Sequence, residues 1–146
     1  MLTIKQLLEA GLPKASVTVR GHRIEISPMP AARNAELMGL FPSPDKPSES
    51  ATHDEHAAYR RAYSRWVLAV ELAEFAVLTG FLCEIPSRGG GEIEFPWKSD
   101  DDTKLLWLEE ARRQLGGSMT RAEIQDVLRA ADAAARGPAA EAARGN

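Results

Sequence analysis

The feature that most constrains this chain is a long helical pattern in its middle, which we extend from Asp54 to about Leu82. Apolar and aromatic residues recur at helical spacing: Tyr59, Tyr63, Trp66, Val67, Val70, Val77, Leu78 and Phe81. Arginines occupy the other side of its first half, whereas its second half, residues 66–82, is apolar on most sides. Such a helix must be surrounded, either by the rest of the chain or by a partner.

A capping box opens a short helix at the N-terminus. The Thr3 hydroxyl can accept from the Gln6 amide while Gln6 reaches back, and Gly11 with Pro13 ends the helix. Ile4, Leu7 and Leu8 share one face. We expect this apolar stripe to cover one side of the central helix.

Two alternating runs predict a β-hairpin after this helix, with Gly21-His22 as a type II′ turn. Its buried face would consist of Val17, Val19, Ile24 and Ile26. Because an isolated hairpin is marginally stable in water, this face must pack on helices, and we place it on the central helix.

Proline and glycine residues divide the rest of the chain into helices and loops. Pro30 suits the start of a helix running to about Phe41, and residues 42–54 have too little apolar content for anything but a mobile loop. After a glycine-rich loop at 87–91 and a short strand at 92–95, we expect helices over 103–115 and 120–136. Asp100, Asp101 and Asp102 would cap the first, and a Thr120–Glu123 capping box would begin the second.

The fold class that these elements predict is α+β, mainly α: a helical domain with a small N-terminal hairpin packed on a long central helix. One domain would span residues 1–136, with the mobile loop at about 42–54 and a disordered tail at 137–146. The chain has 146 residues, enough for a sizeable core.

The charge balance and the single cysteine limit the function classes. A net charge of -3 lacks the basic face that nucleic acid requires. Glu71 and Glu74 interrupt the most apolar stretch, which argues against a membrane span. Cys83 fits a buried apolar position, and no secretory leader is visible, so we expect a cytoplasmic protein.

No residue pattern predicts catalysis, a metal or a cofactor. His53 and His56 lack further zinc ligands, and the 87–91 loop lacks the Lys-Ser/Thr of a phosphate-binding loop. The aspartates at 100–102 are explained by capping rather than by acid–base chemistry. The last two helices could form a DNA-reading helix-turn-helix, but their acidic residues favour an ordinary helical hairpin.

The N-terminal third resembles the tail assembly chaperones of long-tailed phages and prophages. The likeness lies in Thr3-Ile4-Lys5-Gln6-Leu7-Leu8-Glu9-Ala10-Gly11-Leu12-Pro13, in Val17-Thr18-Val19-Arg20-Gly21 and in Ile24-Glu25-Ile26-Ser27-Pro28-Met29. It implies a non-enzymatic protein that binds the tape-measure and tail-tube proteins before the tube polymerises, in the host cytoplasm. The sequence also leaves open that the protein forms a homo-oligomer. The alternatives are a structural or connector protein retained in the virion, or a small helix-turn-helix regulator.

Apolar residues beside the two flexible segments are the predicted partner or self-association surface: Leu37, Met38, Leu40, Phe41, Phe95 and Trp97. Aromatic residues are frequent anchors of interfaces, so we assign that role to Phe41 and Trp97. The competing interpretation is that these residues belong to the core.

Overall fold

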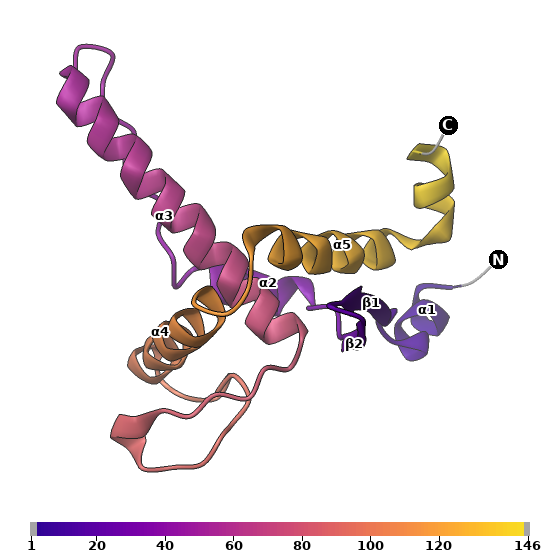
Figure 1. Cartoon of the computed structure of the whole chain (residues 1–146). Coiled ribbons are helices and arrows are strands. Elements are labelled where there is room, and N and C mark those ends of the chain that lie inside the picture. The colour runs from indigo at the N-terminus through magenta and orange to yellow at the C-terminus, as the bar shows by residue number, and fades with distance from the viewer. Residues whose placement is uncertain (1–2, 145–146) are drawn as a thin grey trace.

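The computed structural model describes residues 3–144, without the side chains of Ser87 and residues 137–144. Within that range it has five α-helices, one 3-10 turn and one two-stranded antiparallel sheet, which confirms the mainly α, α+β class. In chain order these are α1 (Ile4–Ala10), β1 (Ala15–Val19), β2 (His22–Ile26), α2 (Ala31–Met38), α3 (His53–Leu78), η1 (Pro86–Arg88), α4 (Asp101–Gly116) and α5 (Arg121–Arg144) (Figure 1).

The central helix α3 is shorter than predicted at its C-terminal end. Its N-cap is Thr52 rather than Asp54, since the Thr52 hydroxyl accepts from the Glu55 amide. It stops at Leu78 because Gly80 takes a φ of +65°. The Phe81 amide then returns to the Ala76 carbonyl at 3.0 Å, as in a Schellman cap. The apolar periodicity that continued to residue 82 belongs to the loop that follows.

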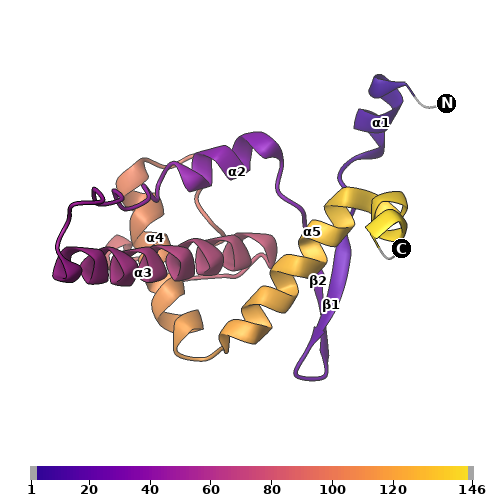
Figure 2. The same ribbon diagram turned by 90° about the horizontal axis from the view of Figure 1, so that it is seen from above.

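The two halves of α3 have different surroundings. Its second half supplies five buried residues, Leu72, Ala73, Phe75, Ala76 and Leu78, and both α4 and α5 pack on it (Figure 2). Trp107 of α4 and Val127 of α5 are fully buried in the same core. The first half projects beyond the other helices as an arm, which we define as residues 53–68 (Figure 1).

The hairpin has the predicted buried face but a different turn and a different supporting helix. Val17 pairs with Ile24 and Val19 with His22, so the turn residues are Arg20-Gly21. Both have positive φ, 51° and 78°, which is typical of a type I′ rather than a type II′ turn. The hairpin lies mainly against α5 rather than on the central helix (Figure 2).

Three polar contacts fix the hairpin in that place. The Arg20 guanidinium donates to both Glu123 carboxylate oxygens, at 2.6 and 2.8 Å, and to the Ser118 carbonyl at 2.6 Å. At the other end of the sheet, the Ser27 amide donates to the Leu78 carbonyl at 3.0 Å. The hairpin therefore bridges the end of α3 and the start of α5.

The predicted caps of the last two helices are confirmed. Asp100 accepts from the Thr103 amide at 2.8 Å, and Thr120 and Glu123 form the reciprocal capping box. The expected strand at 92–95 is reduced to one bridge between Ile93 and Cys83.

Helix α5 continues beyond the predicted end at residue 136. Its backbone is helical to Arg144, through most of the expected tail at 137–146, of which residues 145–146 lie outside the described residues. The disorder of that tail stays a prediction.

Candidate protein-interaction surfaces

Helix α1 has an apolar edge that nothing in the described chain covers. Ile4, Leu7 and Leu8 are 72, 54 and 74% exposed, and Leu12 just after the helix is 53% exposed. The capping box and the positive φ of Gly11 are present as predicted. The prediction that this stripe covers the central helix is wrong, because α1 has no buried residue and lies away from α3 (Figure 1).

The six residues predicted as an interface are divided between core and surface. Leu37 is fully buried and Phe95 is 7% exposed, so both contribute to the core of the isolated chain. The remaining four, Met38, Leu40, Phe41 and Trp97, are half-buried and pack against that core. The proposed anchors Phe41 and Trp97 line two different grooves rather than one surface.

The groove beside Phe41 is the more apolar of the two. It lies between α3 and α4, encloses about 330 Å³, and is lined by Phe41, Ala69, Leu105, Leu108, Glu109 and Arg112. Leu105 remains 41% exposed at its edge. Opposite charges on Glu109 and Arg112 flank the apolar floor, which is an arrangement suited to a side chain of a partner protein.

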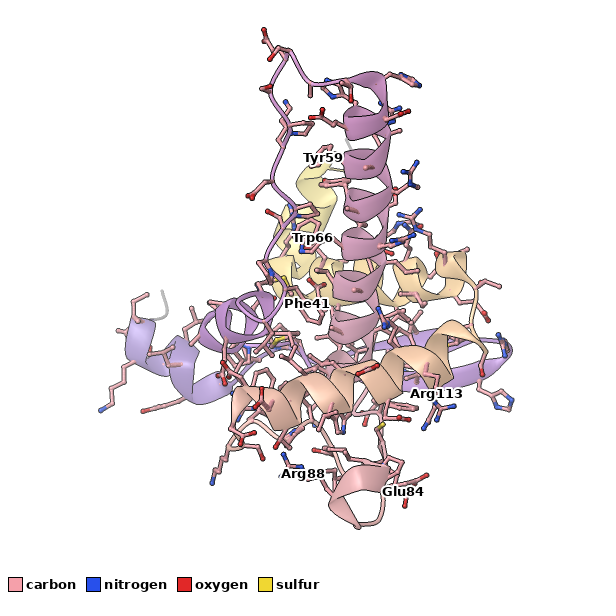
Figure 3. All side chains as sticks on the ribbon, turned by 90° about the vertical axis from the view of Figure 1, so that its left-hand side faces the viewer. Phe41, Tyr59, Trp66, Glu84, Arg88 and Arg113 are labelled. Atoms are coloured by element: carbon pink, nitrogen blue, oxygen red, sulfur yellow. The ribbon has the colours of Figure 1, made fainter. Side chains whose placement is uncertain are left out.

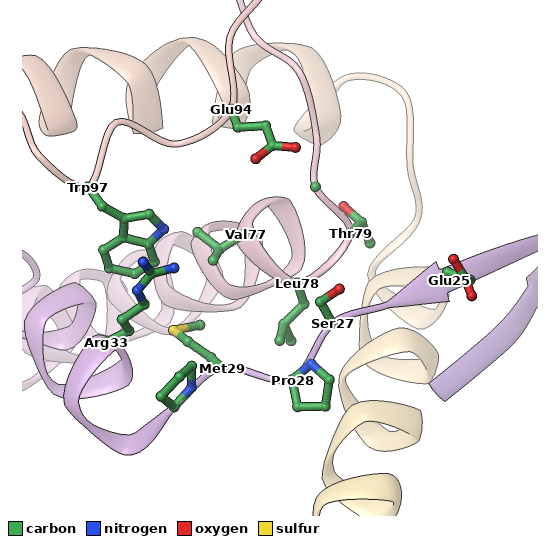
Figure 4. A pocket seen from close by; sticks show the side chains of 12 residues that line it. Glu25, Ser27, Pro28, Met29, Arg33, Val77, Leu78, Thr79, Glu94 and Trp97 are labelled. Carbon is green, nitrogen blue, oxygen red and sulfur yellow. The ribbon is translucent and has the colours of Figure 1, made fainter. Parts of the chain in front are cut away.

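The groove beside Trp97 is polar and about 390 Å³ in volume. Figure 4 shows Trp97 and Arg33 at one end and Glu25 at the other, with Glu94 and Thr79 between them. The Arg33 guanidinium lies 4.9 Å from the Trp97 ring centroid. The Trp97 and Phe95 rings form a T-shaped pair whose centroids are 4.6 Å apart. Trp97 therefore contacts both a cation and a second aromatic ring, as an interface anchor or a core-closing residue would.

The arm carries two unlike faces. On one face Tyr59, Tyr63 and Trp66 form an aromatic row with centroid separations of 6.0 and 5.6 Å. On the other, Arg60, Arg61 and Arg65 gather in a shallow depression with Ala57 and Ser64. Among the described residues, no carboxylate forms a salt bridge with these three arginines. Both faces of the arm present groups that a partner protein can contact.

The titratable groups do not gather into a metal-binding arrangement in the described part of the chain. Within residues 3–144 no three His, Cys, Asp or Glu side chains converge as metal ligands, and His53 and His56 lie at the exposed start of α3. Burial raises the pKa of the Cys83 thiol. Burial, reinforced by the nearby charge of Glu71, also raises the pKa of Glu74.

Paired charges hold the scaffold together instead. Arg20 lowers the pKa of Glu123 to about 2, with help from the Thr120 amide. Lys104, buried in α4, forms a close ion pair with Glu36 of α2. These groups join elements that are distant in sequence, and the pKa shift at Glu123 follows from that structural role.

Comparisons with family models, curated proteins and solved structures give no match to this chain. None of the helices within residues 3–144 has the combination of length and apolar character needed to cross a membrane.

Proposed function

We propose that this chain is a non-enzymatic protein-binding protein of the tail assembly chaperone type, which holds tape-measure or tail-tube proteins before they assemble. The observation that carries the proposal is the uncovered apolar edge of α1. Its large apolar residues Ile4, Leu7 and Leu8, together with Leu12, expose more than half of their surface. Exposed apolar side chains grouped on one short element are typical of a segment that binds another protein.

The length of α1 strengthens this interpretation. A helix of seven residues is not stable alone in water, even with a capping box, since nucleation is costly. Insertion of its apolar edge into a groove on a client would supply the missing stabilisation, about 1.5–3 kcal/mol for each large side chain that is fully buried. This is the helix-in-groove mode of recognition, with anchors at Ile4, Leu7 and Leu8.

The charge distribution on α5 disfavours the regulator alternative. Arg121, Arg129 and Arg136 each form a salt bridge with a carboxylate of the same chain, to Glu71, Asp126 and Asp132. A helix that reads DNA needs free cations to meet phosphates and bases. A structural protein retained in the virion remains the second candidate, and its presence in purified particles would distinguish it from a chaperone.

The test is a binding experiment with a defined client. The full chain and the Leu7→Ser/Leu8→Ser variant are each mixed with the tape-measure protein of the same genome, and complexes are measured by size-exclusion chromatography with light scattering. We expect the variant to bind at least about tenfold more weakly, since two apolar anchors are lost. Lys5→Ser/Glu9→Ser is the matched control on the same helix.

Equal binding by the wild type and by both variants would exclude α1 as the binding element. Absence of any complex between the wild type and both the tape-measure and tail-tube proteins would overturn the proposed client class.

A further inference from the structure

A proline-rich segment of the same chain runs along the aromatic face of the arm. Residues 42–52, which we call the strap, run beside the arm from the end of α2 to the start of α3 (Figure 3). Tyr59 and Trp66 lie on the side of α3 that faces the strap (Figure 3). Tyr63 lies between them, with its ring centroid 6.0 Å from that of Tyr59 and 5.6 Å from that of Trp66, so the three rings form a continuous row on α3.

The strap is attached to the arm at its two ends. At its start, the Trp66 indole N–H donates to the Phe41 carbonyl at 2.8 Å. At its end, Thr52 caps α3. Between these points, no hydrogen bond of the described residues joins residues 43–51 to α3. The middle of the strap therefore lies beside α3 without a hydrogen bond to it.

The chemistry of the strap indicates what the aromatic row recognises. Pro42, Pro44 and Pro47 have no backbone N–H and favour extended backbone, and the latter two are half-buried. Proline rings packed on a row of Tyr and Trp side chains are the basis by which aromatic grooves bind extended proline-rich segments. The strap thus carries the proline-rich chemistry that an aromatic row recognises, and it runs beside that row (Figure 3).

Part of the aromatic row remains open to a competitor. Tyr63, at its centre, is 45% exposed. Among the hydrogen bonds of the described residues, none involves the hydroxyl of Tyr59 or Tyr63, so both can donate to the carbonyls of an extended chain. A partner can therefore contact Tyr63 before the strap leaves.

We propose that the face formed by Tyr59, Tyr63 and Trp66 is a docking site for an extended, proline-rich segment of a partner protein, and that the strap occupies it in the free chain. This site is separate from α1 and does not depend on the client binding proposed above. Because a tethered segment competes at a high effective concentration, the strap lowers the apparent affinity of any partner.

The experiment uses a labelled ten-residue peptide with the sequence of residues 41–50 and the full chain carrying Pro42→Ser, Pro44→Ser and Pro47→Ser. Fluorescence anisotropy measures binding, and circular dichroism verifies the helix content. We expect the variant to bind the peptide at least about tenfold more tightly than the wild type, since its own strap no longer competes. A peptide with alanine in place of the three prolines should not bind.

Further substitutions locate the binding face. Tyr63→Ala in the strap variant should abolish peptide binding, whereas Arg60→Ala on the opposite face and Leu7→Ser/Leu8→Ser on α1 should leave it unchanged. Equal binding of the proline and alanine peptides, or binding that survives Tyr63→Ala, would overturn the proposal.

A second measurement keeps the wild-type strap and applies if the triple variant loses helix content. Decaproline, which contains no cleavable residue, is added to the wild-type chain, and a glutamate-specific protease cleaves after Glu49 in the strap. Displacement of the strap should raise the cleavage rate, and a rate that is unchanged at saturating peptide would contradict the proposal.

Discussion

The ion pair between Lys104 and Glu36 gives a sharp test of how α2 is held to α4. The Lys104 side chain is 7% exposed and the Glu36 side chain 43% exposed, so the ammonium group is the buried partner. Its only other carboxylate neighbour in the described chain is Asp101, at 3.9 Å. Removing Glu36 would leave a buried cation almost uncompensated, whereas removing the lysine would leave a carboxylate that water can reach.

The expected effects of the two substitutions are therefore unequal. Glu36→Ala should lower the free energy of unfolding by about 2–4 kcal/mol, somewhat below a fully buried pair because Glu36 is half exposed. Lys104→Met, of similar volume, should change it by less than about 1 kcal/mol. For a domain of this size the larger effect corresponds to a fall in Tm of roughly 4–16 °C.

Urea and thermal denaturation, followed by circular dichroism, measure both effects. Glu9→Ala on the exposed helix α1 is the control for loss of a carboxylate and should lie within about 0.5 kcal/mol of wild type. The double variant Glu36→Ala/Lys104→Met should recover most of the loss, because the unpaired charge has gone. If Lys104→Met costs as much as Glu36→Ala, the reasoning about the buried ammonium is refuted.

Three further predictions follow from other contacts. The folded state raises the pKa of Glu74, so it favours the protonated carboxyl group. The stability that Glu74 contributes is therefore present below about pH 4.5 and is lost as pH rises through the raised pKa. Glu74→Gln should stabilise the protein at pH 7 and should weaken the pH dependence of the free energy of unfolding measured in denaturation curves. Arg20→Ala should raise the pKa of Glu123 from about 2 towards its ordinary range, as seen by carboxyl NMR titration, although the Thr120 hydrogen bonds still lower it. In the wild type, the stability from this pair is present above about pH 4.5 and is lost as pH falls towards 2. An unchanged pKa would contradict the assigned cause. Trp97→Ala should lower the free energy of unfolding by about 1–3 kcal/mol, less than for a fully buried Trp, because the ring is half-buried against Phe95; a loss of more than about 4 kcal/mol would assign it to the core.

Local signals predicted the elements well where one short motif decides a helix end. The capping boxes at Thr3 and Thr120 and the cap at Asp100 all form as expected, because each depends on residues only three positions apart. The predicted end of α3 at residue 82 is wrong because apolar periodicity continues past Gly80, whose positive φ stops the helix.

Tertiary contacts could not be predicted in the same way, because periodicity shows that a face is apolar but not what covers it. The stripe of α1 looked like a core face and is exposed, whereas Leu37 and Phe95 looked like surface anchors and are buried. The position of Lys104 in the core had no local signal at all, since its partner is 68 residues away. The mobility of the proline-rich segment stays a prediction, and its course beside the Tyr59 row is not predictable from local sequence alone.

The contact between Arg20 and Glu123 has a consequence for the order of events during synthesis. The two residues are 103 positions apart, so the hairpin leaves the ribosome long before its supporting helix exists. At ordinary translation rates the delay is about 5–20 s, far longer than the microseconds in which a hairpin forms. During this time the face that includes Ile26 has no α5 to cover it. A nascent chain that stalls before residue 120 would therefore present that face to chaperones and to other nascent chains.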